Sequence, residues 1–352
     1  MRALICHPGA SWATHDVYAG AVEGLKAAGV HLAEWRLDGR IERWHDFLHF
    51  LWRRQRKATP ATAWPKPTPA DTLHAATTGL IERALERGCT DLIVVSAMFL
   101  PPNKIELARR AGLRVWLLCT ESPYDMADEL RVAGLVNGVW THERAALAAF
   151  REVNPCTAYL PHAWRPGVHD RPASASPDVP AADVLFVGSY FPERIAWFES
   201  VDWSGINVAL YGTTELIPKR SPLRQFVRGG LVPNAQLPAL AQASQITINF
   251  FRAPAPGRVA ESLNPRLYEM AAAGVCSVTD WRPEVPEIFG DAVPTFQTPA
   301  EAGAVIRALL ADPVRRRACG LQAQAAVSGA TWIARGQQMV SDIQRWTTAH
   351  KE

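Results

Sequence analysis

The sequence lacks long apolar runs and paired cysteine motifs. None of its apolar stretches approaches the 18 residues of a membrane span. The apolar run in the opening residues, MRALICHPGA, is too short for the core of a signal peptide. The six cysteines are widely spaced, and no two form a C-x-x-C pair. These absences predict a cytoplasmic protein whose thiols are reduced and buried.

Several catalytic motifs are also missing. The chain has no G-x-G-x-x-G after a strand and no G-x-x-x-x-G-K-[ST], which argues against a dinucleotide oxidoreductase and excludes a P-loop NTPase. It has no G-x-S-x-G elbow and no His/Cys cluster with zinc spacing. No two Asp residues are separated by one position, so the usual carboxylate site for a metal–diphosphate complex is absent. We therefore predict no metal site.

Charge is unevenly distributed along the 352 residues. Hydrophobic residues make up 48% and charged residues 20%, values that exclude a disordered or fibrous protein. The net charge is +3, but the segment 36–57 alone holds seven Lys/Arg and three Asp/Glu. That segment therefore carries +4, and the remaining residues sum to −1. A single cationic segment stands out in a nearly neutral chain.

Short apolar runs alternate with amphipathic stretches in both halves of the chain. This alternation predicts parallel sheets with helices on both faces. The segment 41–57 is expected to be a helix with Ile41, Trp44, Phe47, Leu48, Leu51 and Trp52 on one face. A further helix is expected over 71–87 with Asp71 as its N-cap, and the tail 314–350 is expected to be almost entirely helical.

The alternation stops once, in a Pro/Ser/Ala/Asp-rich stretch at 166–180 that is typical of a linker. We predict two Rossmann-like domains, an N-terminal one over 1–165 and a C-terminal one over 181–330. The last helix, 331–352, is expected to return to the N-terminal domain. Ligands of open α/β sheets bind at the carboxyl ends of the strands, so the site is expected in a central cleft between the two sheets.

The most informative stretch is 261–274, ESLNPRLYEMAAAG, which opens a helix after an apolar strand. Asn264 suits the N-cap and Pro265 the first helical position. The free N–H groups and positive dipole end of such a start suit a phosphate. Arg266 is unfavourable in a first turn unless it faces an anion. Glu269 is placed to accept hydrogen bonds from sugar hydroxyls. An ordinary capped helix with solvated charges would show the same pattern.

Several stretches of the second half resemble the CgeB-like family of spore-protein glycosyltransferases. Residues 182–201 and 262–289 are similar to that family's C-terminal domain, which reads strand, Gly-Ser-Tyr, Pro-Glu-Arg and later Asn-x-Arg-x-x-Glu. Residues 229–250 resemble the loop, helix and strand before this motif, and 120–125 and 139–150 resemble points of the N-terminal domain. Glu261 and Glu269 also resemble the pair, eight positions apart, of retaining GT-B glycosyltransferases.

The resemblance implies a GT-B fold and a hexosyltransferase-type enzyme. It would move a sugar from a nucleotide-diphosphate sugar, with a UDP-sugar favoured, to a hydroxyl acceptor. The reaction would retain anomeric configuration and need no metal or other cofactor. Glu269 would hold the ribose; Arg266, Arg194 and the amides near Asn264 would hold the diphosphate. The other donor contacts implied are Gly188, Ser189, Tyr190, Leu231, Val232 and Glu261.

Acceptor-side residues are expected in loops that follow strands of the first half. The catalytic candidates are His15 and Asp16 after the first strand, and Glu121 and Asp125 after the strand 113–119. A general base must reach the acceptor hydroxyl. Asp16 and Asp125 could instead cap the helices that follow them. Three further histidines that follow strands are His7, His142 and His162.

The cationic segment ends in Arg53, Arg54, Arg56 and Lys57. Cations at a helix C-terminus are the ordinary explanation. The alternatives are contacts with the phosphate backbone of a nucleic-acid acceptor or with an anionic membrane surface. Relatives of this type occur in phages, some of which glycosylate modified DNA bases, so such a base is one acceptor hypothesis. The location would then be the host cytoplasm.

Two other functions are compatible with the same fold. One is a non-catalytic two-domain protein that binds a nucleotide or a sugar. The other is a GT-B epimerase acting on the nucleotide sugar itself. The sequence identifies neither the sugar nor the acceptor, which could also be a small molecule, a protein or a glycan.

Overall fold

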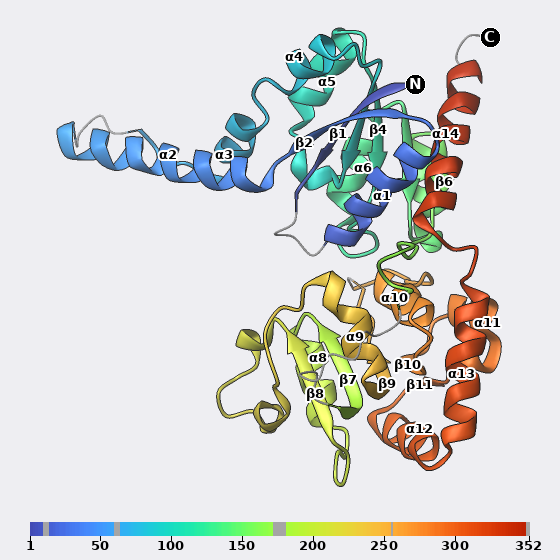
Figure 1. The fold of residues 1–352 in the computed structure, drawn as a ribbon. Helices are drawn as coiled ribbons and strands as arrows, with labels where there is room; N and C mark the ends of the chain where they lie inside the picture. Colours follow the sequence, from blue (N-terminus) through green and yellow to red (C-terminus); the bar gives the residue numbers. More distant parts are fainter. Residues whose placement is uncertain (10–13, 60–63, 172–180, 255, 350–352) are drawn as a thin grey trace. The chain divides into compact units, whose positions relative to one another are not determined.

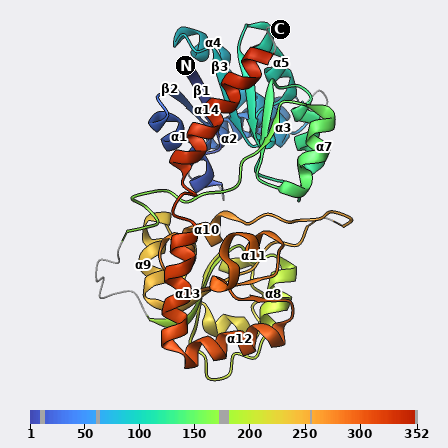
Figure 2. The same cartoon turned by 90° about the vertical axis from the view of Figure 1, so that its right-hand side faces the viewer.

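The computed structural model describes residues 1–9, 14–59, 64–171, 181–254 and 256–349. The chain forms two α/β units, shown in Figures 1 and 2. The first contains Met1–Leu160 and the residues from Arg335 onward, and the second contains Pro161–Ala334. Both sheets are parallel throughout, which confirms the fold class predicted from the alternating pattern. None of the described helices has the length and apolarity that crossing a lipid bilayer requires.

The first unit has a six-stranded sheet in the order β2-β1-β3-β4-β5-β6. Its central strands are apolar throughout because helices cover them on both faces. The strands are β1 (Arg2–His7), β2 (His31–Arg36), β3 (Asp91–Val95), β4 (Arg114–Leu118), β5 (Gly138–Thr141) and β6 (Thr157–Tyr159). One face packs on α3 (Pro69–Ala76), α4 (Leu80–Glu86), α5 (Pro102–Arg110), α6 (Met126–Ala133) and α7 (Leu147–Val153).

The other face carries α1 (His15–Ala27) and the last helix, α14 (Trp332–Ala349). Trp346 of α14 packs against Trp116 and Trp140, with ring centroids 5.8 and 5.5 Å apart. The Trp140 indole N–H donates to Asp342 Oδ2 at 3.0 Å. Figure 2 shows α14 lying along this unit. The last helix is therefore part of the first unit's core.

Helix α2 (Asp38–Ala58) projects from the first unit and has no buried residue (Figure 1). Ile41 and Trp44 pack against the core at its start. The segment after the helix covers the same side further along: the Trp52 indole N–H donates to the Trp64 carbonyl at 3.1 Å, and the Trp64 N–H donates to Gln55 Oε1 at 2.7 Å. Phe47 lies at the edge of this face. Its ring meets the Trp44 ring edge-on with centroids 5.7 Å apart, while its side chain is 49% exposed.

The single helix expected over 71–87 is two helices, α3 and α4. Gly79 between them adopts φ +83°, which ends helical geometry. Asp71 is not the N-cap. The cap is Thr68, whose side chain accepts from the Asp71 N–H, while the Asp71 carboxylate accepts from the Thr68 N–H at 2.8 Å. This capping box places Asp71 three positions inside the helix.

The second unit has a five-stranded sheet in the order β11-β10-β9-β7-β8. The strands are β7 (Ala182–Gly188), β8 (Val208–Gly212), β9 (Ser244–Asn249), β10 (Ser277–Asp280) and β11 (Thr295–Phe296). Side chains of α8 (Pro192–Glu199) and α12 (Pro299–Ala311) pack on one face. Those of α9 (Leu237–Gln242) and α10 (Pro265–Ala272) pack on the other. Helix α11 (Glu284–Phe289) was not expected from the sequence.

The boundaries of the second unit differ from the expected ones. Trp164 pairs with Thr331 in an isolated parallel bridge, and its indole N–H donates to the Val327 carbonyl at 2.7 Å. Residues 161–171 thus belong to the second unit, while 172–180 of the expected linker lie outside the described residues. The tail forms two helices, α13 (Pro313–Ala326) and α14, which agrees with the expectation that 314–350 is almost entirely helical.

All six cysteines are buried and free, as their spacing and apolar surroundings predict. Burial raises the pKa of the Cys119 thiol well above its usual range, and the carboxylates of Glu129 and Glu121 raise it further. Burial also raises the pKa of the Cys276 thiol to about 12. Thiols held protonated in this way are poor nucleophiles.

Candidate active site

The start of α10 lies at the carboxyl edge of the second unit's sheet. Asn264 is its N-cap: Oδ1 accepts from the Leu267 N–H at 3.1 Å. The other end of the same amide donates to Asn249 Oδ1 at 2.8 Å, and Asn249 in turn donates to Thr279 Oγ1 at 2.9 Å. Asn249 ends β9 and Thr279 lies in β10. These hydrogen bonds fix the N-terminal, positive end of α10 against the ends of β9 and β10.

Arg266 and Glu269 form an ion pair on the first turns of α10. Arg266 Nη1 lies 2.7 Å from Glu269 Oε2, and the Glu269 side chain is only 3% exposed. A buried carboxylate is stable when such a partner compensates its charge. Arg266 has further N–H donors beyond the one that Glu269 engages. The acid and the cation that the sequence singles out therefore hold each other.

His169 lies close to this pair, although it falls in the segment expected to be a linker. It is fully buried, and its Nδ1 accepts from the Arg165 N–H at 3.0 Å. A ring nitrogen of His169 lies within 4.8 Å of a Glu269 carboxylate oxygen. Because Nδ1 accepts a hydrogen bond, the neutral ring carries its proton on Nε2. No periodicity surrounds His169 in the sequence, so only the fold reveals it.

The segment that contains Glu261 is held by another buried acid, Glu284. The Leu263 N–H donates to Glu284 Oε2 at 2.7 Å, and the Glu284 N–H donates to the Glu261 carbonyl at 3.3 Å. Glu284 lies in the first turn of α11. These two bonds set the entry of the chain into α10, and no pattern in the sequence singles out Glu284.

The loop after β7 approaches the end of β8 at backbone contact distance. A Cβ on Gly212, whose φ is +120°, would lie 1.8 Å from the Gly188 carbonyl oxygen, so only glycine fits there. The Tyr190 N–H donates to Thr213 Oγ1 at 2.9 Å. Tyr190 itself is buried against Phe186, with ring centroids 5.4 Å apart. Its ring supports the loop from the core side, whereas Leu231 is 81% exposed.

Arg194, expected to hold a diphosphate, is buried and engages backbone carbonyls. Its Nη1 donates to the Ser189 carbonyl at 2.6 Å, and its Nη2 donates to the Phe250 carbonyl. It therefore joins the loops that follow β7 and β9. Asp280 lies near it at the end of β10. Burial raises the pKa of Asp280 to about 6, although the Phe251 N–H, Arg282 and Arg194 act in the opposite direction.

In the first unit, a buried acid organises the loop that carries Glu121. One oxygen of Glu129, on α6, accepts from the Thr120 and Glu121 N–H groups, each at 2.9 Å, and the other accepts from the Ser122 hydroxyl. Burial raises the pKa of Glu129. Glu121 accepts from the Thr120 hydroxyl at 2.9 Å, and Asp125 precedes α6 without a side-chain cap bond. Glu129, an acid in a first turn, was not identified from the sequence.

The residues after β1 form a second group in the first unit. Asp16 is buried in the first turn of α1, whose N-cap position is Thr14, so Asp16 is not the capping residue. His15 meets the Tyr18 ring edge-on with centroids 5.2 Å apart, and His7 stacks on the same ring at 4.0 Å. Burial lowers the pKa of His7 to about 4, so it is neutral at pH 7. Ser11, in the same loop, lies outside the described residues.

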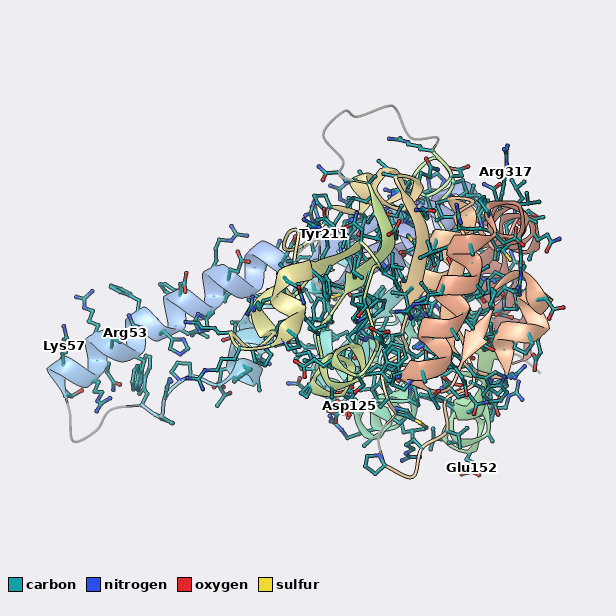
Figure 3. The ribbon with its side chains drawn as sticks, turned by 90° about the horizontal axis from the view of Figure 1, so that it is seen from below. Arg53, Lys57, Asp125, Glu152, Tyr211 and Arg317 are labelled. Atoms are coloured by element: carbon teal, nitrogen blue, oxygen red, sulfur yellow. The ribbon has the colours of Figure 1, made fainter. Side chains whose placement is uncertain are left out.

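The four cations expected to contact phosphates lie together on the projecting end of α2. Figure 3 shows Arg53 and Lys57 there, beyond the remainder of their unit. Both are exposed, as are Arg54 and Arg56. The Arg56 guanidinium lies over the Trp52 ring, 5.4 Å from its centroid, on the side covered by the following segment.

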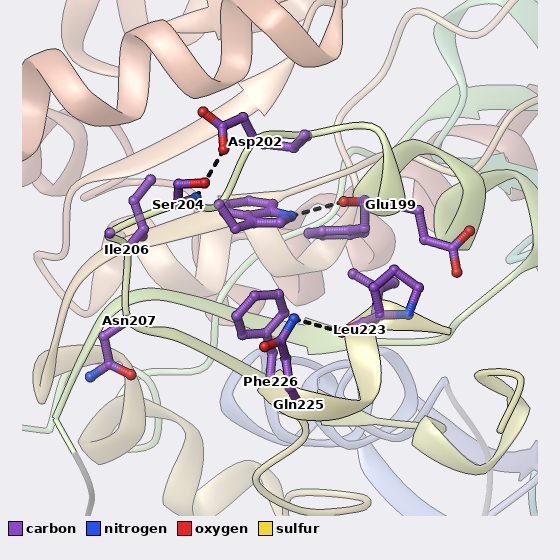
Figure 4. Close-up of a pocket in the computed structure, with 13 residues that line it drawn as sticks. Glu199, Asp202, Ser204, Ile206, Asn207, Leu223, Gln225 and Phe226 are labelled. Carbon is purple, nitrogen blue, oxygen red and sulfur yellow. Dashed lines mark hydrogen bonds between the residues drawn. The ribbon is translucent and has the colours of Figure 1, made fainter. Parts of the chain in front are cut away.

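A pocket of about 640 Å³ in the second unit lies away from these residues (Figure 4). Its lining includes 201–207, which precede β8, so it opens at the amino edge of that part of the sheet. The polar groups there bond to nearby protein groups: Ser204 N–H donates to Asp202 at 3.0 Å, and Gln225 donates to the Pro222 carbonyl at 3.0 Å. Ligands of such sheets bind at the opposite edge. The start of α10 is the better candidate.

One family model matches part of the chain. Residues 194–341 match a family model described as glycosyl transferase-like, a range that includes α10. No curated protein sequence matches the chain significantly.

Solved structures match nearly the whole chain. Sucrose-phosphate synthase from Thermosynechococcus elongatus is 14% identical, with a TM-score of 0.65 and 99% of each chain covered. HepE from Anabaena in complex with UDP-glucose is 12% identical, with a TM-score of 0.65, 98% of this chain and 99% of that one. Trehalose 6-phosphate synthase from Burkholderia multivorans is 12% identical, with a TM-score of 0.64 and 99% of each chain covered. The fold is that of the GT-B glycosyltransferases, and the family match supports a glycosyltransferase.

Proposed function

We propose that the protein transfers a sugar from a UDP-sugar to a hydroxyl acceptor, without a metal ion and with retention of anomeric configuration. The observation that carries the proposal is the buried Glu269 one turn into α10, paired with Arg266 at the carboxyl edge of the sheet. Structures with the same fold include HepE with UDP-glucose and the E. coli trehalose-6-phosphate protein with UDP-2-fluoro glucose. Another, of trehalose-6-phosphate synthase, concerns glycosyl transfer with retention.

Glu269 is proposed to accept hydrogen bonds from the ribose hydroxyls. Its ion pair with Arg266 compensates the charge of the buried carboxylate, and a carboxylate accepts hydrogen bonds only. Such a site favours a group that offers two adjacent hydroxyls. Pairing also lowers the entropic cost of binding, because the carboxylate is already oriented.

The diphosphate is proposed to lie at the start of α10. Two sources of positive potential are available there: the helix dipole and the donors of Arg266 that Glu269 does not engage. They would stabilise the charge that develops on the leaving diphosphate without a metal ion. The hydrogen bonds from Asn264 to Asn249 and from Asn249 to Thr279 hold the helix start in place, so these groups need little rearrangement.

On the acceptor side, Glu121 and Asp125 remain candidate bases, together with His15 and Asp16. Glu129 is proposed as a positioning residue for Glu121, since it accepts from the backbone N–H groups of Thr120 and Glu121. The acceptor is proposed to be a hydroxyl whose proton one of these groups takes up.

The test is transfer and hydrolysis of UDP-glucose by the full chain, together with UDP binding by calorimetry. The variants Glu269→Ala and Arg266→Ala are compared with Glu215→Ala and Arg220→Ala, two exposed residues of the same unit. Full turnover in the first pair would refute the site. UDP binding without turnover would favour a non-catalytic binder, and release of an epimerised nucleotide sugar would favour an epimerase.

A further inference from the structure

The solvent side of α2 carries two phenyl rings among cations. Arg43, Phe47, Phe50, Arg54 and Lys57 are spaced four, three, four and three residues apart, which puts them on one stripe of the helix. We call these five residues the α2 stripe. All are exposed, and the Phe47 and Phe50 side chains are 49% and 56% exposed. The stripe is about 21 Å long at 1.5 Å per residue.

The stripe lies beside the face with which α2 packs on its own unit, and the two meet where the Phe47 ring contacts Trp44 edge-on, with centroids 5.7 Å apart. Ile41 and Trp44 contact the core, and Trp52 and Gln55 bond to the Trp64 backbone. Ile41, Trp52 and Gln55 lie on the opposite side of the helix from Phe50. Phe50 therefore lies away from that packing, and the Phe47 side chain stays 49% exposed beside it.

Charge along α2 is also ordered. The acids Asp38, Glu42 and Asp46 all lie in its first half, and residues 47–58 contain four cations and no acid. Asp46 borders the stripe and is the acid nearest to it. The outer half of the helix, which projects furthest from the unit, therefore combines exposed phenyl rings with positive charge only (Figure 3).

We infer that the α2 stripe docks the protein on an anionic lipid surface. A helix lying in the plane of a bilayer interface places aromatic rings at the acyl boundary and Arg and Lys at the headgroups, which is the arrangement of the stripe. Anionic headgroups attract each nearby cation. A nucleic-acid phosphate backbone would use Arg43, Arg54 and Lys57, but it would have to cross two apolar rings between them. An anionic lipid surface offers an apolar environment for the phenyl rings and negative headgroups for the Arg and Lys side chains.

The first test is sedimentation of the full-length protein with phosphatidylcholine vesicles, with and without phosphatidylglycerol. We expect binding to the anionic vesicles only. The double variant Phe47→Ser/Phe50→Ser should bind at least about tenfold more weakly, and so should Arg54→Glu/Lys57→Glu. The matched controls are Leu85→Ser/Leu107→Ser, with similarly exposed leucines on α4 and α5, and Arg87→Glu/Arg110→Glu. These controls should bind like the unmodified protein.

The second test reports insertion directly. Because all six native cysteines are buried, Phe50→Cys can be labelled selectively with an environment-sensitive fluorophore. Its emission should shift to the blue with anionic vesicles, while the same label at Leu107→Cys should not respond. Unchanged thermal unfolding of each variant shows that the fold is intact.

Three results would overturn the inference. The first is no binding to anionic vesicles. The second is vesicle binding that the Phe47/Phe50 variant leaves unchanged. The third is binding of duplex DNA in place of vesicles, with a steep salt dependence that needs Arg54 and Lys57 but not the phenyl rings. That third result would support the nucleic-acid acceptor instead.

Discussion

Helices α2 and α10 carry similar residue types in opposite surroundings. In α10, six of the eight residues are buried, and Arg266 is fixed to Glu269 at 2.7 Å. In α2 no residue is buried, and Arg53, Arg54 and Lys57 extend into solvent. An Arg beside a buried acid orients a binding group, whereas an exposed Arg contributes potential at a surface. The position of the helix in the fold, more than its composition, therefore sets what its charges do.

The largest expected effect is on catalysis at α10. Glu269→Ala should lower kcat/KM for a UDP-sugar roughly 100- to 1,000-fold, since it removes a preorganised acceptor and leaves Arg266 without its partner. The measurement is initial rates over a range of UDP-glucose concentrations. The α2 variant Arg53→Ala should keep its rate within about twofold, and equal losses in the two variants would break the comparison.

The next effect is on the pH dependence of stability, which should differ between a buried acid of the second unit and an exposed acid of α2. Burial raises the pKa of Asp280 to about 6, so the folded state holds this proton over a range in which the unfolded state has released it. The contribution of Asp280 to stability should therefore fall as pH rises from about 4 to 6 and stay constant above. Asp280→Asn keeps an acceptor for the Phe251 N–H and should remove this loss, which is at most about 3 kcal/mol.

Chemical denaturation at pH 4, 5, 6 and 7 measures how the unfolding free energy of each variant depends on pH. Asp46→Asn on α2 is the control, because the Asp46 side chain is 85% exposed. The prediction fails if the two variants show the same change in pH dependence.

A smaller effect is expected at the start of α10. Asn264→Ala removes a helix cap and the bond to Asn249, which should cost about 1–2 kcal/mol of unfolding free energy. It should also weaken UDP binding. Thr298→Ala removes the cap of α12 in the same unit and should cost about 1 kcal/mol without changing UDP affinity. Urea denaturation and calorimetry measure the two quantities, and an unchanged UDP affinity in both variants would contradict the role given to α10.

The smallest effect is on the stability of α2. Phe47→Ser/Phe50→Ser should lower the unfolding free energy by no more than about 1 kcal/mol, because both rings are about half exposed and the edge-on contact of Phe47 with Trp44 is the aromatic pair removed. Thermal unfolding in the absence of lipid is the measurement. A loss above 2 kcal/mol would mean that the rings support the fold.

Local patterns predicted α10 well, since Asn264-Pro265 and Gly274 mark its two ends and the structure has Pro265–Ala272. The same kind of reasoning was wrong for 71–87, where Gly79 splits the helix. It also could not find Glu129, His169 or Glu284. Their partners are backbone groups or side chains brought near by the fold, and the sequence around them carries no repeating pattern.

The sequence by itself determined the two parallel α/β units, the helix start at Asn264 and the cationic segment, because propensity, periodicity and charge are properties of neighbouring residues. Only the tertiary structure decided which charges are buried and paired. Burial depends on chain segments distant in sequence, as when Arg194 joins the loops after β7 and β9. The same dependence made Glu269 a desolvated, oriented carboxylate and left Phe47 and Phe50 exposed among cations.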